Sequence, residues 1–180
     1  MEQEESTRGG GAGKYYIESA RAELAITRAI TDTNPGSAPT VFDMVLKYLG
    51  AHKMCLYAWD DAEQKYKTVD IFGKDKVDIR LKHLNDEDER YFRYVNEYGF
   101  LQMDNINNLD TMDKKRFHMY LEDNVGSTME ILSQSEDKTC RVLICFDIYK
   151  PARTFQPHKI VFAIMVAKLI SHALYSKIEA

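Results

Sequence analysis

The sequence has few cysteines, and none of them shows a spacing that would stabilise a small secreted domain. The three cysteines are an odd number, and no two form a Cys-x-x-Cys pair. All three, Cys55, Cys140 and Cys145, lie in apolar, strand-like runs, so we expect free thiols in the protein interior. This pattern favours a cytoplasmic protein over a disulfide-bonded extracellular one.

An excess of positive charge and a long apolar run are also missing. Lys and Arg number 24 against 28 Asp and Glu, and the net charge of −4 disfavours a nucleic-acid partner. The longest apolar run, residues 160–167, has eight residues, whereas about 20 are needed to span a bilayer. The start of the chain is acidic, unlike a signal peptide. We therefore expect neither nucleic acid nor membrane among the partners.

Patterns typical of metal sites and of nucleophilic catalysis are absent from the sequence. The five histidines neither pair at a spacing of four residues nor stand near a cysteine in a ligand spacing, so we expect no metal. A nucleophilic Cys or Ser needs a base beside it, and no motif here predicts such a pair. We expect a protein that is not an enzyme and that carries no cofactor.

The N-terminal part of the chain divides into a tail and two helices. Residues 1–13 are acidic and then glycine-rich, which predicts a flexible tail. Apolar residues recur at helical spacing over residues 14–32. After a breaker rich in Pro and Gly, residues 40–49 form a second amphipathic helix, and we expect the domain itself to extend from residue 40 to residue 180.

The rest of the domain predicts two strand pairs separated by an irregular insertion, residues 74–126. The expected strands are residues 52–59, 66–72, 127–133 and 139–149. Within the insertion we expect helices at residues 84–98 and 111–123 and a short strand at residues 100–104. The pattern indicates an α+β fold in three layers, with terminal helices on one face of an antiparallel sheet and the insertion on the other.

Short motifs stand at fixed places in this order of segments. They are Phe72-Gly73 at a strand end, Asp104 after a short strand, Gly126-Ser127 ahead of a strand, and Arg153-Thr154-Phe155 ahead of the last helix. With the segment order, they resemble the GAF domain family of small-molecule sensors over about residues 40–176. One position departs from the family pattern, because Arg141 stands where glycine is usual.

The resemblance implies a pocket for a small, unidentified ligand between the sheet and the insertion. The residues expected to line it are Tyr57, Trp59, Phe72, Tyr91, Met103, Asp104, Phe117, Tyr120 and Glu130. Alternatively, the aromatic residues simply fill a core. The carboxylates of Glu130 and Asp70 either face solvent through strand alternation or bind a polar group of the ligand.

Two specialised activities of GAF-related proteins are less favoured. Bilin-binding members carry a cysteine in the insertion, but no cysteine lies between Cys55 and Cys140 here. A free methionine sulfoxide reductase of this family uses cysteines in the insertion that closes its pocket. In this chain Cys140 and Cys145 lie on one predicted strand and five residues apart, so we expect them on opposite faces.

The last helix is apolar on nearly all sides from residue 160 onward, more than one sheet can cover. We expect its second face to pair with another copy of the chain, in a homodimer held by the terminal helices. The expected interface residues are Tyr16, Leu24, Val161, Met165, Lys168, Leu169 and His172. An alternative seam on the same helix uses Phe162 and Val166 with Leu169.

Two functions are compatible with these features. The first is a regulatory domain that binds a small molecule and signals through its terminal helices to an output domain in a longer protein. The second is a dimerisation module without a ligand. A cavity between the sheet and the insertion would distinguish the first from the second.

Overall fold

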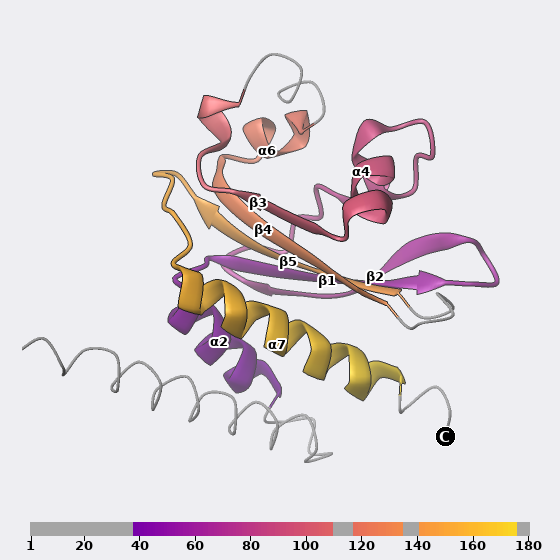
Figure 1. Cartoon of the computed structure of the whole chain (residues 1–180), viewed down its shortest axis with the longest axis horizontal. Helices are drawn as coiled ribbons and strands as arrows, with labels where there is room; N and C mark the ends of the chain where they lie inside the picture. Colours follow the sequence, from indigo (N-terminus) through magenta and orange to yellow (C-terminus); the bar gives the residue numbers. More distant parts are fainter. Residues whose placement is uncertain (1–37, 110–116, 135–140, 176–180) are drawn as a thin grey trace, which may run out of the picture.

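The computed structural model describes residues 38–109, 117–134 and 141–175. The predicted helix at residues 14–32, with Tyr16 and Leu24, lies outside these residues, and so does Cys140. The described chain forms three layers, with two long helices on one side of a sheet and several short helices on the other (Figure 1). The three-layer α+β fold predicted from the sequence is confirmed.

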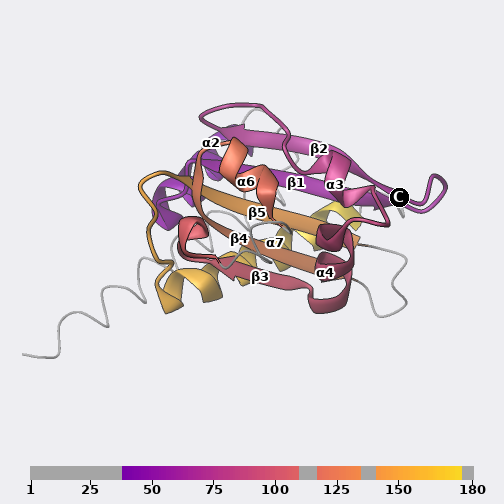
Figure 2. The same cartoon turned by 90° about the horizontal axis from the view of Figure 1, so that it is seen from above.

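The middle layer is an antiparallel sheet in the order β2-β1-β5-β4-β3 (Figure 2). Its strands are β1 Lys53–Asp60, β2 Lys65–Gly73, β3 Phe100–Met103, β4 Val125–Gln134 and β5 Arg141–Tyr149. Strand β5 pairs with both β1 and β4 and so joins the two predicted strand pairs. Because β5 is central and covered on both faces, nearly all of its residues are buried.

Helices α2 (Ala38–Leu49) and α7 (Pro157–Tyr175) cover one face of the sheet (Figure 1). Apolar residues at helical spacing turn Val45 and Leu49 of α2 toward the sheet, where they share a core with Phe162 and Val166 of α7. Full burial of one such side chain stabilises the fold by about 1.5–3 kcal/mol. This core holds both helices against the sheet.

The outer side of α7 remains partly exposed. Val161 is 66% exposed, Lys168 and His172 are exposed, and Met165 and Leu169 are half-buried. These five residues lie on the side of α7 that the dimer prediction uses, and the interface stays a prediction.

The alternative seam on α7 is wrong, because Phe162 and Val166 face the sheet and are buried. In the described part of the chain one helical stretch, Pro157–Leu174, is long and apolar enough to cross a membrane by length and composition. One third of that stretch (33%) is buried, and the core helix of a water-soluble domain passes the same test.

The insertion covers the opposite face of the sheet (Figure 2). Its elements are α3 Leu81–Leu84, α4 Arg90–Tyr98, the 3-10 helix η1 Ile106–Asn108 and α6 His118–Glu122. Gly99 ends α4 with a left-handed φ of 68°, which glycine adopts without the steric cost of a Cβ atom. The helix end that the sequence predicts at residue 98 is confirmed.

The single helix predicted at residues 84–98 is wrong, since the structure has α3 and α4 separated by a turn. The side chain of Asn85 explains the break. Its amide pairs with the backbone of Tyr66 in β2, accepting from N at 2.6 Å and donating to O at 2.8 Å. These two tertiary hydrogen bonds fix the residue that ends α3 on the sheet.

A register shift in the β1–β2 pair changes which residues of β2 share a face of the sheet. Leu56 lies opposite Asp70 and Tyr57 lies opposite Thr68, so Val69 is left over as a bulge. A bulge reverses the inward and outward alternation on one side of it. As a result Tyr66 and Ile71 share the insertion face, although simple alternation predicts them on opposite faces.

Candidate functional site

Arg80, at the start of α3, is fully buried, which is rare for arginine unless it is paired. The carboxylate of Asp78 positions it, since Oδ1 accepts hydrogen bonds from the backbone N of Arg80 at 3.1 Å and of Leu81 at 3.0 Å. The same oxygen accepts from the Tyr57 hydroxyl of β1 at 2.9 Å. Asp78 thereby holds the loop on the sheet and directs Arg80 under the insertion.

The guanidinium of Arg80 joins two buried carboxylates of the sheet. Nε donates to Glu130 Oε1 of β4 at 2.9 Å, and Nη1 donates to Asp147 Oδ2 of β5 at 2.9 Å. Nη2 donates to the other oxygen of Asp147 and, at 3.2 Å, to Thr128 Oγ1. Sγ of Cys55 lies 3.8 Å from Nη1. The five N–H groups of a guanidinium thus all have acceptors in this chain.

Two tyrosines of the insertion complete the coordination of Glu130. The Tyr91 hydroxyl of α4 donates to Oε2 at 2.9 Å, and the Tyr120 hydroxyl of α6 donates to Oε1. Burial, and then the charge of Glu130, raise the pKa of both tyrosines well above the ordinary value, so both hydroxyls stay protonated as donors. We call Arg80, Glu130, Asp147, Thr128, Tyr91 and Tyr120 the Arg80 network.

The charge of Arg80 is maintained although the site is closed to water. Burial is the largest influence and opposes the charged form, but the carboxylate of Asp147 and the other surrounding groups, Glu130 among them, together raise the pKa of the guanidinium well above its usual value. Desolvating each ion costs several kcal/mol, and only close geometry with further hydrogen bonds offsets that cost. The Arg80 network meets this condition.

A second buried cation, Lys53 of β1, lies beside this network. Its ammonium is 3.0 Å from Asp75 Oδ1 and 3.5 Å from Asp123 Oδ2, and it donates to the carbonyl of Val77. Burial lowers the pKa of Lys53, but the hydrogen bond with Asp75 and the neighbouring negative charges produce a net increase. Lys53 ties the loop after β2 to the sheet.

The structure brings two cysteines together across strands, which sequence spacing did not predict. Cys55 of β1 pairs in register with Cys145 of β5, and both thiols are free and buried. Burial raises the pKa of Cys55 to about 11 and raises the pKa of Cys145 well above the ordinary value. A thiol that stays protonated is a poor nucleophile, so this pair does not favour a cysteine-dependent enzyme.

Strand β4 also connects the site with the loop that leads into α7. Ser127 Oγ donates to the backbone O of Asp104 at 2.7 Å and accepts from the backbone N of Arg153 at 2.8 Å. Asp104 Oδ1 accepts from the backbone N of Phe155 at 3.4 Å. A Cβ atom on Gly126 would lie 2.9 Å from the backbone of Ala152, so the loop passes directly over β4.

Most of the predicted pocket residues do share the insertion face. The buried cluster on that face contains Tyr57, Tyr91, Met103, Phe117 and Tyr120, with Trp59 at its margin. Glu130 also points into this layer and is buried, so of the two alternatives left open for it, the one in which it faces solvent is wrong. Simple strand alternation holds at Glu130, but the insertion covers the face that would otherwise meet water.

Three other residues singled out in the sequence lie away from the Arg80 network. Phe72 pairs with Met54 on the opposite face and packs in a tilted arrangement against Phe42 of α2, with 4.3 Å between ring centroids, so its predicted place in the pocket is wrong. Asp70 is exposed. Arg141 extends over the ring of Trp59, 4.6 Å from its centroid, at the margin of the insertion face.

Two central residues of the Arg80 network, Arg80 and Asp147, were not predicted from the sequence. Asp147 could have been found, because it stands between Phe146 and Ile148 just as Glu130 stands between two apolar residues. Arg80 follows a run of alternating charges in a loop, so no periodic signal marks it. Its role depends on a tertiary contact with two strands that are far away in the sequence.

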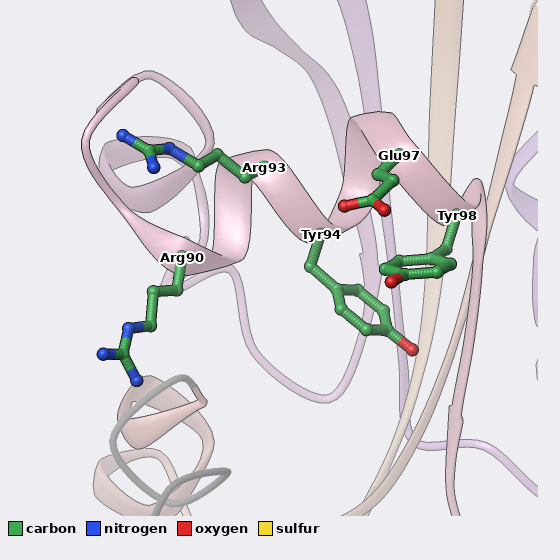
Figure 3. Close-up of a pocket in the computed structure, with 5 residues that line it drawn as sticks. All are labelled: Arg90, Arg93, Tyr94, Glu97 and Tyr98. Atoms are coloured by element: carbon green, nitrogen blue, oxygen red, sulfur yellow. The ribbon is translucent and has the colours of Figure 1, made fainter.

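The surface of α4 carries a shallow hollow of about 220 Å³, lined by Arg90, Arg93, Tyr94, Glu97 and Tyr98. Figure 3 shows the two arginines near the start of the helix, while the rings of Tyr94 and Tyr98 lie beside each other toward its end. Their centroids are 4.7 Å apart. No group of three His, Cys, Asp or Glu that could hold a metal occurs within residues 38–109, 117–134 and 141–175.

Comparison with solved structures identifies the fold. The GAF domain of Acinetobacter phosphoenolpyruvate-protein phosphotransferase matches with a TM-score of 0.66 and 14% identity, over 88% of this chain and 93% of that chain. The chain has the fold of a GAF domain. GAF3 of Slr1393 from Synechocystis, in its photoproduct state, matches this GAF fold with a TM-score of 0.55 and 14% identity, over 86% of this chain and 94% of that chain.

A longer structure also contains this GAF fold. The chromophore-binding domain of the bacteriophytochrome RpBphP3 from R. palustris matches with a TM-score of 0.63 and 12% identity, over 92% of this chain and 63% of that chain. No protein-family model and no curated protein matches the sequence. The predicted resemblance to GAF domains is therefore confirmed for the fold, and the function has to be argued from this chain's own residues.

Proposed function

We propose that this chain is a cytoplasmic regulatory domain that senses a small molecule between the sheet and the insertion. The observation that supports this most directly is the Arg80 network, a buried group of ion pairs between those two layers. Stability does not require such a network, because apolar residues of similar volume are often as stable as a buried ion pair. Each ion in the Arg80 network is stable in the interior only while its partners are in place. Such a network is suited to a switch between a closed state, with the insertion packed on the sheet, and an open state.

The proposed signal leaves the site through β4. Thr128 and Glu130 belong to the network, and Ser127, next to Thr128, binds the loop before α7 at the backbone of Arg153. A ligand that shifts β4 or the insertion therefore acts on the position at which α7 begins. Coupling between sites requires that the ligand binds two such arrangements with different affinity. In a longer protein, α7 would pass the change to an output domain.

A thermal-shift screen of polar metabolites tests the sensing proposal. A compound that binds the folded state raises the unfolding midpoint, by an amount that grows with the logarithm of its concentration above Kd. Tyr91→Phe serves as the matched variant, because it removes one hydroxyl from Glu130 and keeps the ring. We expect a compound that stabilises the wild type and has a weaker effect on Tyr91→Phe. Stabilisation that is equal in both proteins would place the ligand elsewhere and contradict the proposal.

One observation favours the alternative of a dimerisation module without a ligand. Val161 is 66% exposed on α7, and exposed Met44 (49%) lies on α2, the other helix of that face. Isolated exposed apolar side chains are common on monomers, so the molecular mass in solution has to show whether the chain forms a dimer. A chain that sediments as a dimer and binds no compound in the screen would favour this alternative over sensing.

A further inference from the structure

The guanidinium of Arg80 occupies the space between the sheet and the insertion in the way that a bound ligand would. It enters from the loop between β2 and α3, and its guanidinium is held by acceptors from three other parts of the chain. The sheet contributes two carboxylates and the Thr128 hydroxyl, and α6 contributes the face of Tyr120, whose ring centroid is 4.8 Å from Cζ of Arg80. Two carboxylates, a hydroxyl and an aromatic face are groups that bind a planar cation.

The charges around this place select against anions. The cations are Arg80 and Lys53, and the carboxylates joined to them directly or through the loop are Glu130, Asp147, Asp75, Asp78 and Asp123. Two positive against five negative charges leave a net charge of −3 over these seven groups. With Arg80 withdrawn, two buried carboxylates would lack a cation, and a buried charge without a partner is strongly unfavourable.

We propose that Arg80 is an internal occupant of the ligand site and that the ligand is a small organic cation with a guanidinium or amidinium head. This inference rests on the proposed sensing function and names its ligand class. The planar head would replace the guanidinium of Arg80 on Asp147 and Glu130 with the same parallel N–H donors. The ligand can bind only when the Arg80 side chain leaves the site, so ligand binding is coupled to opening of the loop between β2 and α3.

Competition with Arg80 sets the affinity of the wild-type chain. The loop is anchored by Asp78 on Tyr57 and Thr68, at 2.9 and 2.5 Å, so the closed state predominates. A ligand that binds only the open state has an apparent affinity lowered by the fraction of open molecules. Removing the side chain of Arg80 removes that competition and exposes the ligand preference of the site.

The test is chemical rescue of Arg80→Ala in the full chain, followed by thermal unfolding. The probes are methylguanidinium and N-methylurea, which share a planar shape and differ in charge. We expect Arg80→Ala to unfold at a lower temperature than the wild type. Methylguanidinium should restore stability with the logarithmic concentration dependence of binding at one site, by roughly 5–10 °C at a hundred times Kd, while N-methylurea has no such effect. Arg93→Ala, which removes an exposed arginine of α4, should show no rescue.

Two results would overturn the inference. One is rescue of equal size by both probes, and the other is no stabilisation of Arg80→Ala by methylguanidinium. If Arg80→Ala does not fold, Arg80→Lys replaces it, since the ammonium keeps the charge but loses the planar fork. Arg80→Lys should then bind methylguanidinium more tightly than the wild type does, and equal or weaker binding refutes the inference.

The same experiment separates the ligand class from sensing itself. A neutral or anionic compound that stabilises the wild type, combined with no binding of methylguanidinium to Arg80→Ala, would refute the cation class and leave sensing intact. Rescue of Arg80→Ala together with a screen in which no compound stabilises the wild type would show a cation site that is permanently occupied by Arg80. That result would refute both sensing and the displacement of Arg80.

Discussion

Removal of the Asp147 carboxylate is the perturbation whose effect follows most directly from the structure. Asp147 is fully buried, accepts two hydrogen bonds from the Arg80 guanidinium and accepts a third from Thr128 Oγ1 at 2.7 Å. Asp147→Ala leaves a buried guanidinium with only Glu130 as its charged partner. Breaking a buried ion pair from one side costs about 3–5 kcal/mol. For a chain of this length that loss corresponds to roughly 6–20 °C in the unfolding midpoint.

Thermal and urea unfolding of four proteins measure this effect as a double-mutant cycle. The proteins are the wild type, Asp147→Ala, Arg80→Ala and the double variant. Because the two residues share one interaction, the double variant should lose less stability than the sum of the single losses, by about 2–3 kcal/mol. Asp88→Ala, which breaks a fully exposed pair with Arg93, is the control and should stay near the wild type. Additive losses, or an Asp147→Ala midpoint close to that of Asp88→Ala, would refute the reasoning.

Three further outcomes are expected. Met165→Glu on α7 should convert dimers to monomers in sedimentation, whereas Val77→Glu, an exposed apolar position outside α7, should not; dimers of both variants would refute the interface. Tyr91→Phe should lower stability by about 1.5–3 kcal/mol in urea unfolding, because a hydrogen bond to a buried carboxylate is lost. Burial raises the pKa of Cys55 to about 11 and of Tyr66 to about 12, so the folded state holds protons that the unfolded chain releases. Stability should therefore fall as the pH rises from about 9 to 12, by at most about 1.4 kcal/mol per pH unit and group, and Cys55→Ala should reduce the slope between pH 9 and 11.

The order of layers could be predicted because it follows from sequence patterns that extend over a few residues. Helical spacing places Val45 and Leu49 on one face of α2, and alternation within β4 separates Glu130 from Met129 and Ile131. Gly99 marks a helix end through a conformation that glycine adopts most easily. Signals of this kind act over a few residues, so they can be found without knowing which segments meet in space.

The site could be predicted only in part, because its chemistry depends on distant contacts. Tyr91, Tyr120 and Glu130 were found, since family resemblance and strand alternation both placed them in the layer under the insertion. Arg80 was missed, because its acceptors lie about 50 and 67 residues away in the sequence. The face of Phe72 was predicted wrongly, because a bulge in β2 has no clear sequence signal.

Amide hydrogen exchange on Arg80→Ala, with and without saturating methylguanidinium, measures whether occupancy of this site reaches α7. The account predicts slower exchange both in the insertion around residues 78–98 and in the loop and first turns at residues 150–165, because Ser127 and Asp104 hold that loop on β4. Slower exchange confined to the insertion, with residues 150–165 unchanged, would show binding without a signal and would contradict the account.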